Sequence, residues 1–305
     1  MGPMIGRRAV AAALAWLIAG CTGALQTAAP TASPTPGPTT ATVQAEFDVG
    51  GRKMHLYCVG PIDPARPTVI FEGGLEDLGA EWNNVLTELG GSTRACVYDR
   101  AGRGKSRQSD PAEVGRTTTD QVADLHRLLA AASVPPPYLL VGFSLGGWNV
   151  MVFHDLYPTE VSGVVMVDVR PPAFTQRSAD ALPPESPTES ADIKFIRHEA
   201  PAFELDPTLN DEGLLLAESA LEAIATDDFG DLPLLVLAAA DITENYTELD
   251  TGLSATLQGI WWELQDDLVE RSTVGRLIKV DNTSHDIPFE RPDAVVAAMR
   301  ELLGT

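Results

Sequence analysis

Cysteine and histidine are scarce in this sequence, with three and five residues among 305. They show no close ligand spacing, so we expect no metal site. Basic residues are also few: 21 lysines and arginines stand against 43 acidic residues, a formal net charge of −22. Such a surface repels phosphate groups, so we expect no nucleic-acid partner. The 44% hydrophobic content is enough for a sizeable core that needs neither metals nor disulfides.

The first apolar run indicates an export signal. The run "AVAAALAWLIAG" follows Arg7 and Arg8 and is short for a membrane span. It ends in "IAGC", which resembles the lipobox of bacterial lipoproteins, where the cysteine, here Cys21, becomes the lipidated first residue. An ordinary signal peptide or a plain membrane anchor is the alternative. We therefore predict a signal peptide over 1–21 and membrane attachment only through the lipid anchor, at the outer face of the cell membrane.

A linker and one large domain are expected to follow. Residues 22–43 include the tract "TAAPTASPTPGPTTAT", whose composition favours an extended, solvated tether. From residue 44 to 305, strand-like runs alternate with helical stretches. The predicted strands lie in the segments 45–60 (two strands around Gly50 and Gly51), 67–74, 93–100, 138–144, 163–169, 232–241 and 275–282. The predicted helices cover 117–134, 145–158, 257–270 and 291–303.

This alternation predicts an α/β domain with a mostly parallel sheet. Parallel strands need long crossover connections, and continuous Val/Leu/Ile runs are typical of strands buried on both faces. The segment of about 170–230 departs from the pattern, because it is rich in proline, serine and acids and has helical fragments but no strong strand. We predict that it is a helical lid inserted over the sheet.

The stretch "VGFSLGG", residues 141–147, contains a G-x-S-x-G motif centred on Ser144. It lies between a predicted strand and a predicted helix, which is the context of a nucleophile elbow. In that turn the serine is raised above the sheet at the N-terminus of the next helix, whose dipole favours developing negative charge. A base is also required, and His285 follows the last predicted strand, whereas the other four histidines lie in a strand, two helices and the insertion.

These segments resemble the serine-hydrolase branch of the α/β-hydrolase superfamily over residues 44–303. The resemblance rests on the elbow, on "YDRAGRGKS" (residues 98–106) and on the segment around "DNTSHDIPFERPDAVV". It implies an α/β-hydrolase fold with a sheet of about eight strands flanked by helices, and no cofactor. It also implies a triad of Ser144, His285 and an aspartate. We expect Asp168 as the acid, with Asp241 as the alternative, since each ends a strand and the glycine usual after the later strand is missing.

The resemblance further implies an oxyanion hole and brings two cysteines together. The hole would use the amide of Leu145 and that of Leu75 or Gly74; Gly73 stands where the family has a histidine. The strands that hold Cys58 and Cys96 would be neighbours, so these residues form either a disulfide or two buried thiols.

The function that follows is an exported, membrane-tethered serine hydrolase. Its expected substrate is a small uncharged or apolar ester, because the lid is acidic and carries apolar residues, namely Phe174, Phe195, Phe203 and 214–216. Lactones, thioesters and amides use the same chemistry. The alternative is a lipoprotein that keeps the fold and binds a ligand or partner without catalysis.

Overall fold

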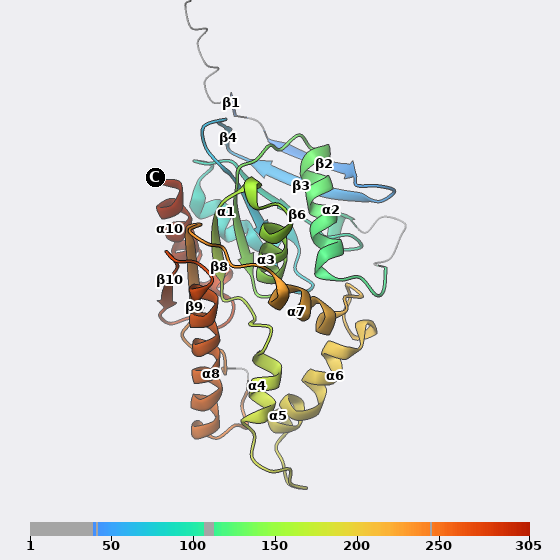
Figure 1. Cartoon of the computed structure of the whole chain (residues 1–305), viewed down its shortest axis with the longest axis vertical. Coiled ribbons are helices and arrows are strands. Elements are labelled where there is room, and N and C mark those ends of the chain that lie inside the picture. Colours follow the sequence, from blue (N-terminus) through green and yellow to red (C-terminus); the bar gives the residue numbers. More distant parts are fainter. Residues whose placement is uncertain (1–38, 41, 107–112, 245) are drawn as a thin grey trace, which may run out of the picture. The chain divides into compact units, whose positions relative to one another are not determined.

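The computed structural model describes residues 39–40, 42–106, 113–244 and 246–305 (Figure 1). The predicted signal peptide, its Cys21 and most of the predicted tether lie outside these residues. In the described part of the chain, no helix is long and apolar enough to cross a membrane. Thr39–Thr40 (β1) pair with Pro61–Ile62 (β4) as two short antiparallel strands.

Eight strands of the described chain form one sheet in the order β10-β9-β8-β7-β5-β6-β3-β2 (Figure 1). From β10 to β6 the neighbouring strands are parallel, whereas β3 pairs antiparallel with both β6 and β2. The central strands are the apolar runs that the sequence predicted, and every residue of β5, β6, β7 and β9 is buried. The strands are β2 (Val43–Asp48), β3 (Lys53–Val59), β5 (Thr68–Glu72), β6 (Ala95–Tyr98), β7 (Tyr138–Phe143), β8 (Val161–Val167), β9 (Leu234–Ala239) and β10 (Arg276–Val280).

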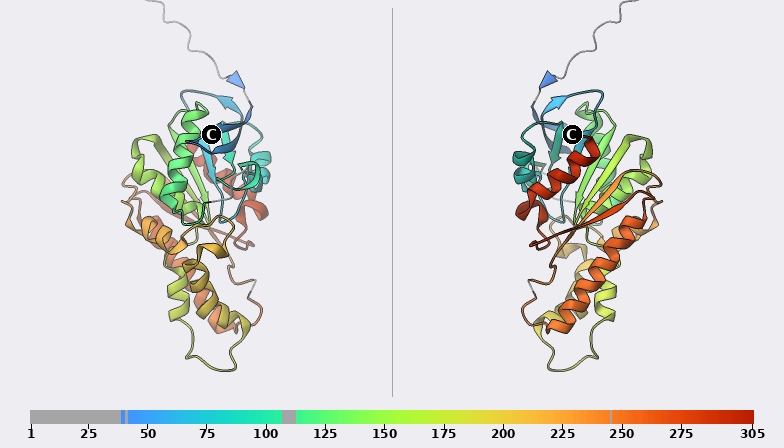
Figure 2. Two further views of the ribbon diagram at one scale, coloured as in Figure 1. Left: turned by 90° about the vertical axis from the view of Figure 1, so that its right-hand side faces the viewer. Right: turned by 90° about the vertical axis from the view of Figure 1, so that its left-hand side faces the viewer.

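Helices cover both faces of the sheet (Figure 2). Apolar side chains of α2 (Thr118–Ala131), α3 (Gly146–Leu156) and α7 (Leu216–Ala225) share one core with one face of the sheet. Side chains of α1 (Asn83–Leu89) and α10 (Pro292–Leu303) share a second core with the other face. The predicted α/β-hydrolase fold is therefore confirmed, including its mostly parallel sheet of eight strands.

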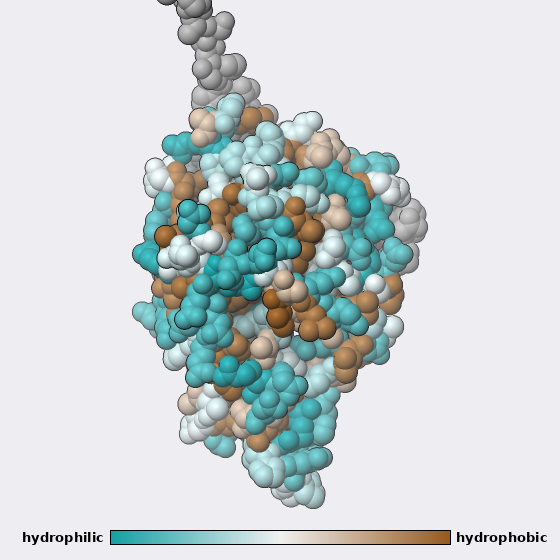
Figure 3. Space-filling view, in the orientation of Figure 1, coloured by the Kyte–Doolittle hydropathy of each residue, from teal (hydrophilic) through white to brown (hydrophobic). Residues whose placement is uncertain are grey.

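The insertion between β8 and β9 is helical, as predicted. It contains α4 (Phe174–Asp180), α5 (Ala191–Lys194), a π-helical segment (Phe195–Glu199), α6 (Ala200–Leu205) and α7. Its core is shared with α8 (Thr251–Glu270), which starts six residues before the predicted helix and packs beside α4. Figure 3 shows the surface of the molecule in the orientation of Figure 1. Hydrophilic residues cover most of it, and hydrophobic ones lie near its centre around α7, where Leu221 and Ile224 are exposed.

Cys58 and Cys96 form a disulfide in this structure, with their sulfur atoms 2.06 Å apart. They lie directly opposite each other on the antiparallel pair β3 and β6. Both residues are fully buried. Of the two alternatives that the sequence left open, the structure has the bonded one, which links the antiparallel edge of the sheet to its parallel centre.

Candidate active site

Ser144 occupies a sharp turn between the end of β7 and the start of α3. Its φ angle is +50°, in the left-handed region that non-glycine residues rarely adopt. The turn requires glycine at position 146, because a Cβ there would lie 2.4 Å from the Glu72 carbonyl oxygen. Position 147 has the same requirement, since a Cβ would lie 2.2 Å from a methyl group of Val169. Backbone strain of this kind is typical of functional turns and sets the serine above the sheet.

A chain of two hydrogen bonds connects Ser144, His285 and Asp168. The Nε2 atom of His285 lies 2.9 Å from Ser144 Oγ, and its Nδ1 atom lies 2.6 Å from Asp168 Oδ2. A carboxylate can only accept, so it favours the tautomer with hydrogen on Nδ1 and leaves Nε2 free to accept the serine proton. The sequence predicted all three residues, and the structure brings them together from the ends of β7, β8 and β10.

Asp168 is held by a set of donors that no sequence pattern predicted. It is completely buried, and its φ angle of +40° marks a second strained residue beside the site. Its Oδ1 atom accepts hydrogen bonds from the Trp261 indole at 2.9 Å and from the Ala239 amide at 2.8 Å. With His285 on Oδ2, three donors surround one carboxylate. Trp261, from α8, also packs edge-on against the His285 ring, so it orients both groups.

Asp241, the alternative acid, does not reach the histidine. It is exposed, and its Oδ1 atom accepts hydrogen bonds from the amide and hydroxyl of Thr243. The histidines other than His285 lie where the sequence placed them, in β3, α2, α3 and the lid. His126, for example, stacks on Tyr157 at a ring separation of 3.8 Å. The geometry therefore favours Asp168 and leaves Asp241 as a loop residue.

Two backbone amides beside Ser144 suit an oxyanion hole. Neither the amide of Leu145 nor that of Leu75 bonds to any described residue, and both residues line the same cavity as Ser144. The amide of Gly74 is already used, because it donates to Asp77 Oδ2 at 2.7 Å. Gly74 is thus the wrong choice of the two predicted loop donors, and Leu75 remains. No sequence pattern signals this difference, because it depends on the Asp77 side chain.

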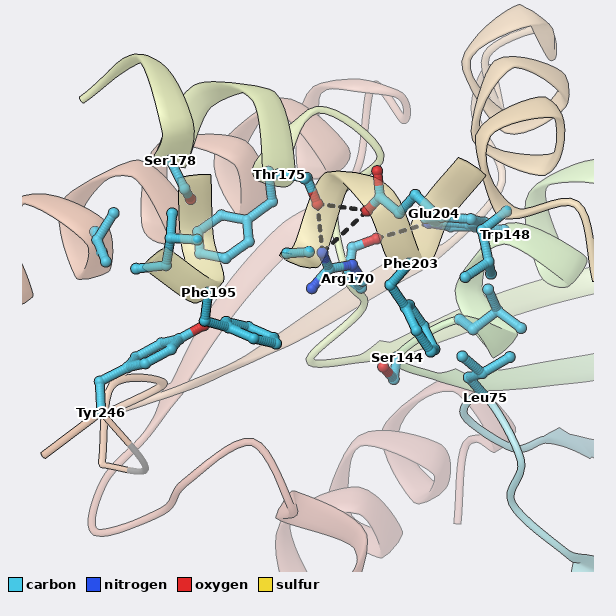
Figure 4. Close-up of a pocket in the computed structure, with 16 residues that line it drawn as sticks. Leu75, Ser144, Trp148, Arg170, Thr175, Ser178, Phe195, Phe203, Glu204 and Tyr246 are labelled. Atoms are coloured by element: carbon cyan, nitrogen blue, oxygen red, sulfur yellow. Dashed lines mark hydrogen bonds and ion pairs between the residues drawn. The ribbon is translucent and has the colours of Figure 1, made fainter. Parts of the chain in front are cut away.

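A cavity of about 260 Å³ opens beside Ser144 and under the lid (Figure 4). Most of its walls are apolar, and they include three of the predicted lid phenylalanines together with Leu216. Several polar groups also line it, among them Arg170, Thr175, Ser178 and Glu204. Among the residues that the structure describes, no group of three or more metal-binding side chains is present.

Comparison with known proteins decides the family. The model of the alpha/beta hydrolase family matches residues 73–298. The chain belongs to this family. It is 28% identical over 240 residues to the uncharacterized protein YqjL of Bacillus subtilis (strain 168), covering 77% of this chain and 83% of YqjL.

Solved structures share the fold of this alpha/beta hydrolase. Cfl2 from Burkholderia cenocepacia superposes with a TM-score of 0.57 at 18% identity, over 85% of this chain and 95% of Cfl2. A thermophilic esterase from Thermogutta terrifontis superposes with a TM-score of 0.56 at 20% identity, over 86% of this chain and 98% of the esterase. Members of the alpha/beta hydrolase family are typically hydrolases.

A buried ion pair ties the helical insertion of this family member to the loop that carries Leu75. Arg100 donates two hydrogen bonds to Glu212, at 2.8 and 2.7 Å, and both side chains are at most 5% exposed. The same guanidinium also donates to the carbonyl oxygens of Gly73 and Gly74. Glu212, which belongs to the lid, accepts a hydrogen bond from the backbone amide of Glu76 at 2.6 Å. The pair therefore fixes the residues on both sides of Leu75.

Two carboxyl groups lie close to Arg100, and their pKa values shift in opposite directions. Burial acts to raise the pKa of Glu212, but Arg100, with help from the Glu76 amide and from Arg103, lowers that pKa below its usual value. Glu72 is also buried and lies 3.6 Å from Arg100, and burial raises the pKa of its carboxyl group. Arg100 thus has Glu212 as its principal counter-ion.

Replacing Glu212 with glutamine is expected to damage both stability and catalysis. It leaves the buried Arg100 without its closest negative charge, which costs about 3 kcal/mol in the free energy of unfolding. Arg100 would then hold the carbonyl oxygens of Gly73 and Gly74 less firmly. The Leu75 amide would shift with them, which would lower kcat by up to about 100-fold. Urea denaturation and ester kinetics measure the two effects. Asp211→Asn is the matched control, since its ion pair with Arg103 involves a 75% exposed carboxylate and contributes about 0–1 kcal/mol. Equal behaviour of the two variants would contradict this role.

Proposed function

We propose that this protein is an exported, lipid-anchored serine hydrolase that cleaves a small uncharged ester through an acyl-enzyme. The observation that carries the proposal is the hydrogen-bonded chain from Ser144 through His285 to Asp168, at the mouth of a mostly apolar cavity. Membership of the alpha/beta hydrolase family supports hydrolysis as the reaction class. Export and anchoring rest on the amino-terminal sequence and Cys21.

The proposed reaction has two halves, each with balanced protons. In the first, Ser144 Oγ attacks the ester carbonyl while His285 Nε2 takes the serine proton, and the histidine then donates it to the leaving alcohol. In the second, His285 takes a proton from water, the hydroxide attacks the acyl-serine, and the acid leaves as Ser144 regains its proton. Asp168 stabilises the positively charged imidazole in both halves.

The amides of Leu145 and Leu75 are proposed to stabilise the negative oxygen of each tetrahedral intermediate. Donors that are fixed before reaction need no reorganisation when charge develops, and the loss of one such donor typically lowers kcat by about 10²–10³. The ion pair of Arg100 and Glu212 keeps the loop of Leu75 in place.

A panel of p-nitrophenyl esters with graded acyl chains tests the proposal. We expect turnover with a maximum at a short or medium chain, because the cavity of about 260 Å³ limits the acyl group. A lipoprotein that only binds ligands would retain the fold but release no p-nitrophenol above the background of Ser144→Ala. That result would replace the hydrolase by the binding protein that the sequence left as the alternative.

A further inference from the structure

The cavity beside Ser144 lies between two apolar groups of side chains. One belongs to the core shared by the sheet, α3 and α7, and contributes Leu145, Trp148 and Leu216. The other belongs to the core shared by the lid and α8, and contributes Phe174 and Ile196. A substrate chain that enters the cavity from Ser144 therefore meets apolar walls on both sides. A polar group in these walls can select for a polar substituent on that chain.

One such polar group is the hydroxyl of Ser178. Ser178 is 3% exposed and lines the cavity, yet its Oγ atom has no hydrogen-bond partner among the described residues (Figure 4). Thr175 lies three positions earlier on α4 and therefore on the same face of the helix. A buried hydroxyl without a partner costs about 1–3 kcal/mol, so a ligand oxygen that bonds to it recovers part of that cost.

The second polar group is the guanidinium of Arg170. Its Nη2 atom lies 3.1 Å from Glu204 Oε1 and also donates to Thr175 Oγ1 (Figure 4). In the part of the chain that the structure describes, its Nε and Nη1 groups have no hydrogen-bond acceptor. The guanidinium also lies over the Phe174 ring, with Cζ 5.8 Å from the ring centroid. Arg170 thus has free donors beside an apolar wall.

The charge of Arg170 is already balanced by Glu204. A second carboxylate at this place would meet the negative charge of Glu204 as well as the positive charge of Arg170. An uncharged oxygen, by contrast, accepts from Nε or Nη1 without disturbing the ion pair. The net charge of −22 disfavours anionic ligands further.

We propose that the cavity binds a substrate chain that carries an uncharged oxygen substituent, such as a hydroxyl or keto group, some carbons away from the scissile ester. The substituent bonds to Ser178 Oγ, the ion pair of Arg170 and Glu204 disfavours a charged substituent, and the rest of the chain packs against the apolar walls. This inference rests on the proposed ester hydrolysis at Ser144, and it assigns Ser178, Arg170 and Glu204 to substrate specificity.

The test compares three kinds of p-nitrophenyl ester, matched in chain length at six to eight carbons. The first kind has a plain chain, the second is a series with one hydroxyl at successive positions, and the third ends in a carboxylate. We expect the wild type to favour the best hydroxy ester over the plain ester by about tenfold in kcat/KM. Ser178→Ala should reduce this ratio to near one, because the hydroxy ester loses far more kcat/KM than the plain ester does. Ser186→Ala, at an exposed lid serine, is the control and should keep the wild-type ratio.

A second variant tests the charge argument. Glu204→Gln removes the balancing negative charge, so it should raise kcat/KM for the carboxylate ester relative to the plain ester by about tenfold. Equal losses on both neutral esters in Ser178→Ala, or no preference for a hydroxyl at any position in the wild type, would overturn the inference while ester hydrolysis stands. No hydrolysis of any ester, together with no labelling of Ser144 by a fluorophosphonate, would overturn the proposed function and this inference with it.

Discussion

Replacing Ser144 with alanine is expected to abolish ester hydrolysis, with kcat falling by a factor on the order of 10⁵–10⁶. The change removes the only atom that attacks the carbonyl and leaves the oxyanion amides and the cavity in place. The residual rate then comes from binding and the oxyanion hole alone. The variant should fold normally, because a single partly exposed hydroxyl is lost. Steady-state kinetics and thermal unfolding measure the two effects.

Ser133→Ala is the matched control for this experiment. Ser133 has a φ angle of +54°, close to that of Ser144, but it is exposed in the turn after α2. Both substitutions therefore place alanine in the same kind of strained backbone. If the Ser144 variant kept more than a few per cent of wild-type kcat, another residue would have to be the nucleophile.

Replacing Asp168 with asparagine is expected to lower kcat by about 10⁴, while Asp241→Asn changes it by less than about threefold. The amide of asparagine can donate to His285 Nδ1 and so favours the tautomer whose Nε2 carries hydrogen and cannot accept the serine proton. It also removes the negative charge that stabilises the imidazolium. Asp241 is exposed, and among the described residues its side chain bonds only to Thr243, so loss of its charge leaves the site unchanged.

The comparison of these two variants separates the candidate acids directly. Measuring kcat and KM for one ester with both proteins is enough, since the expected difference is more than a thousandfold. An inactive Asp241→Asn beside an active Asp168→Asn would show that the acid follows β9, and the 2.6 Å contact between Asp168 and His285 would then have no catalytic meaning.

The sequence predicted the parts of the fold that depend on local patterns. The continuous apolar runs of β5, β7 and β9 identified the parallel centre, and the glycines around Ser144 identified the turn that carries it. The helix α1 was missed, because its seven residues bury only Val85 and Leu89 and show little periodicity. The start of α8 was also missed, since Thr251 and Gly252 are exposed and the buried residues of the helix begin only at Leu257.

The site details that the sequence left open depend on residues far apart along the chain. The choice between Asp168 and Asp241 follows from Trp261, which lies 93 residues after Asp168. The position of the Leu75 loop depends on Arg100 and Glu212, which are 112 residues apart. No local spacing links such residues, and only the folded chain brings them within hydrogen-bond distance.

The most direct test of the central claim is to locate the covalent adduct that a fluorophosphonate forms on this protein. Such a reagent reacts with a serine only where a base and an oxyanion hole activate it. Mass spectrometry of the digested protein should find one adduct per chain, on Ser144, and none in Ser144→Ala. An unlabelled wild-type protein, or an adduct on a different residue, would contradict the assignment of Ser144 as an activated nucleophile.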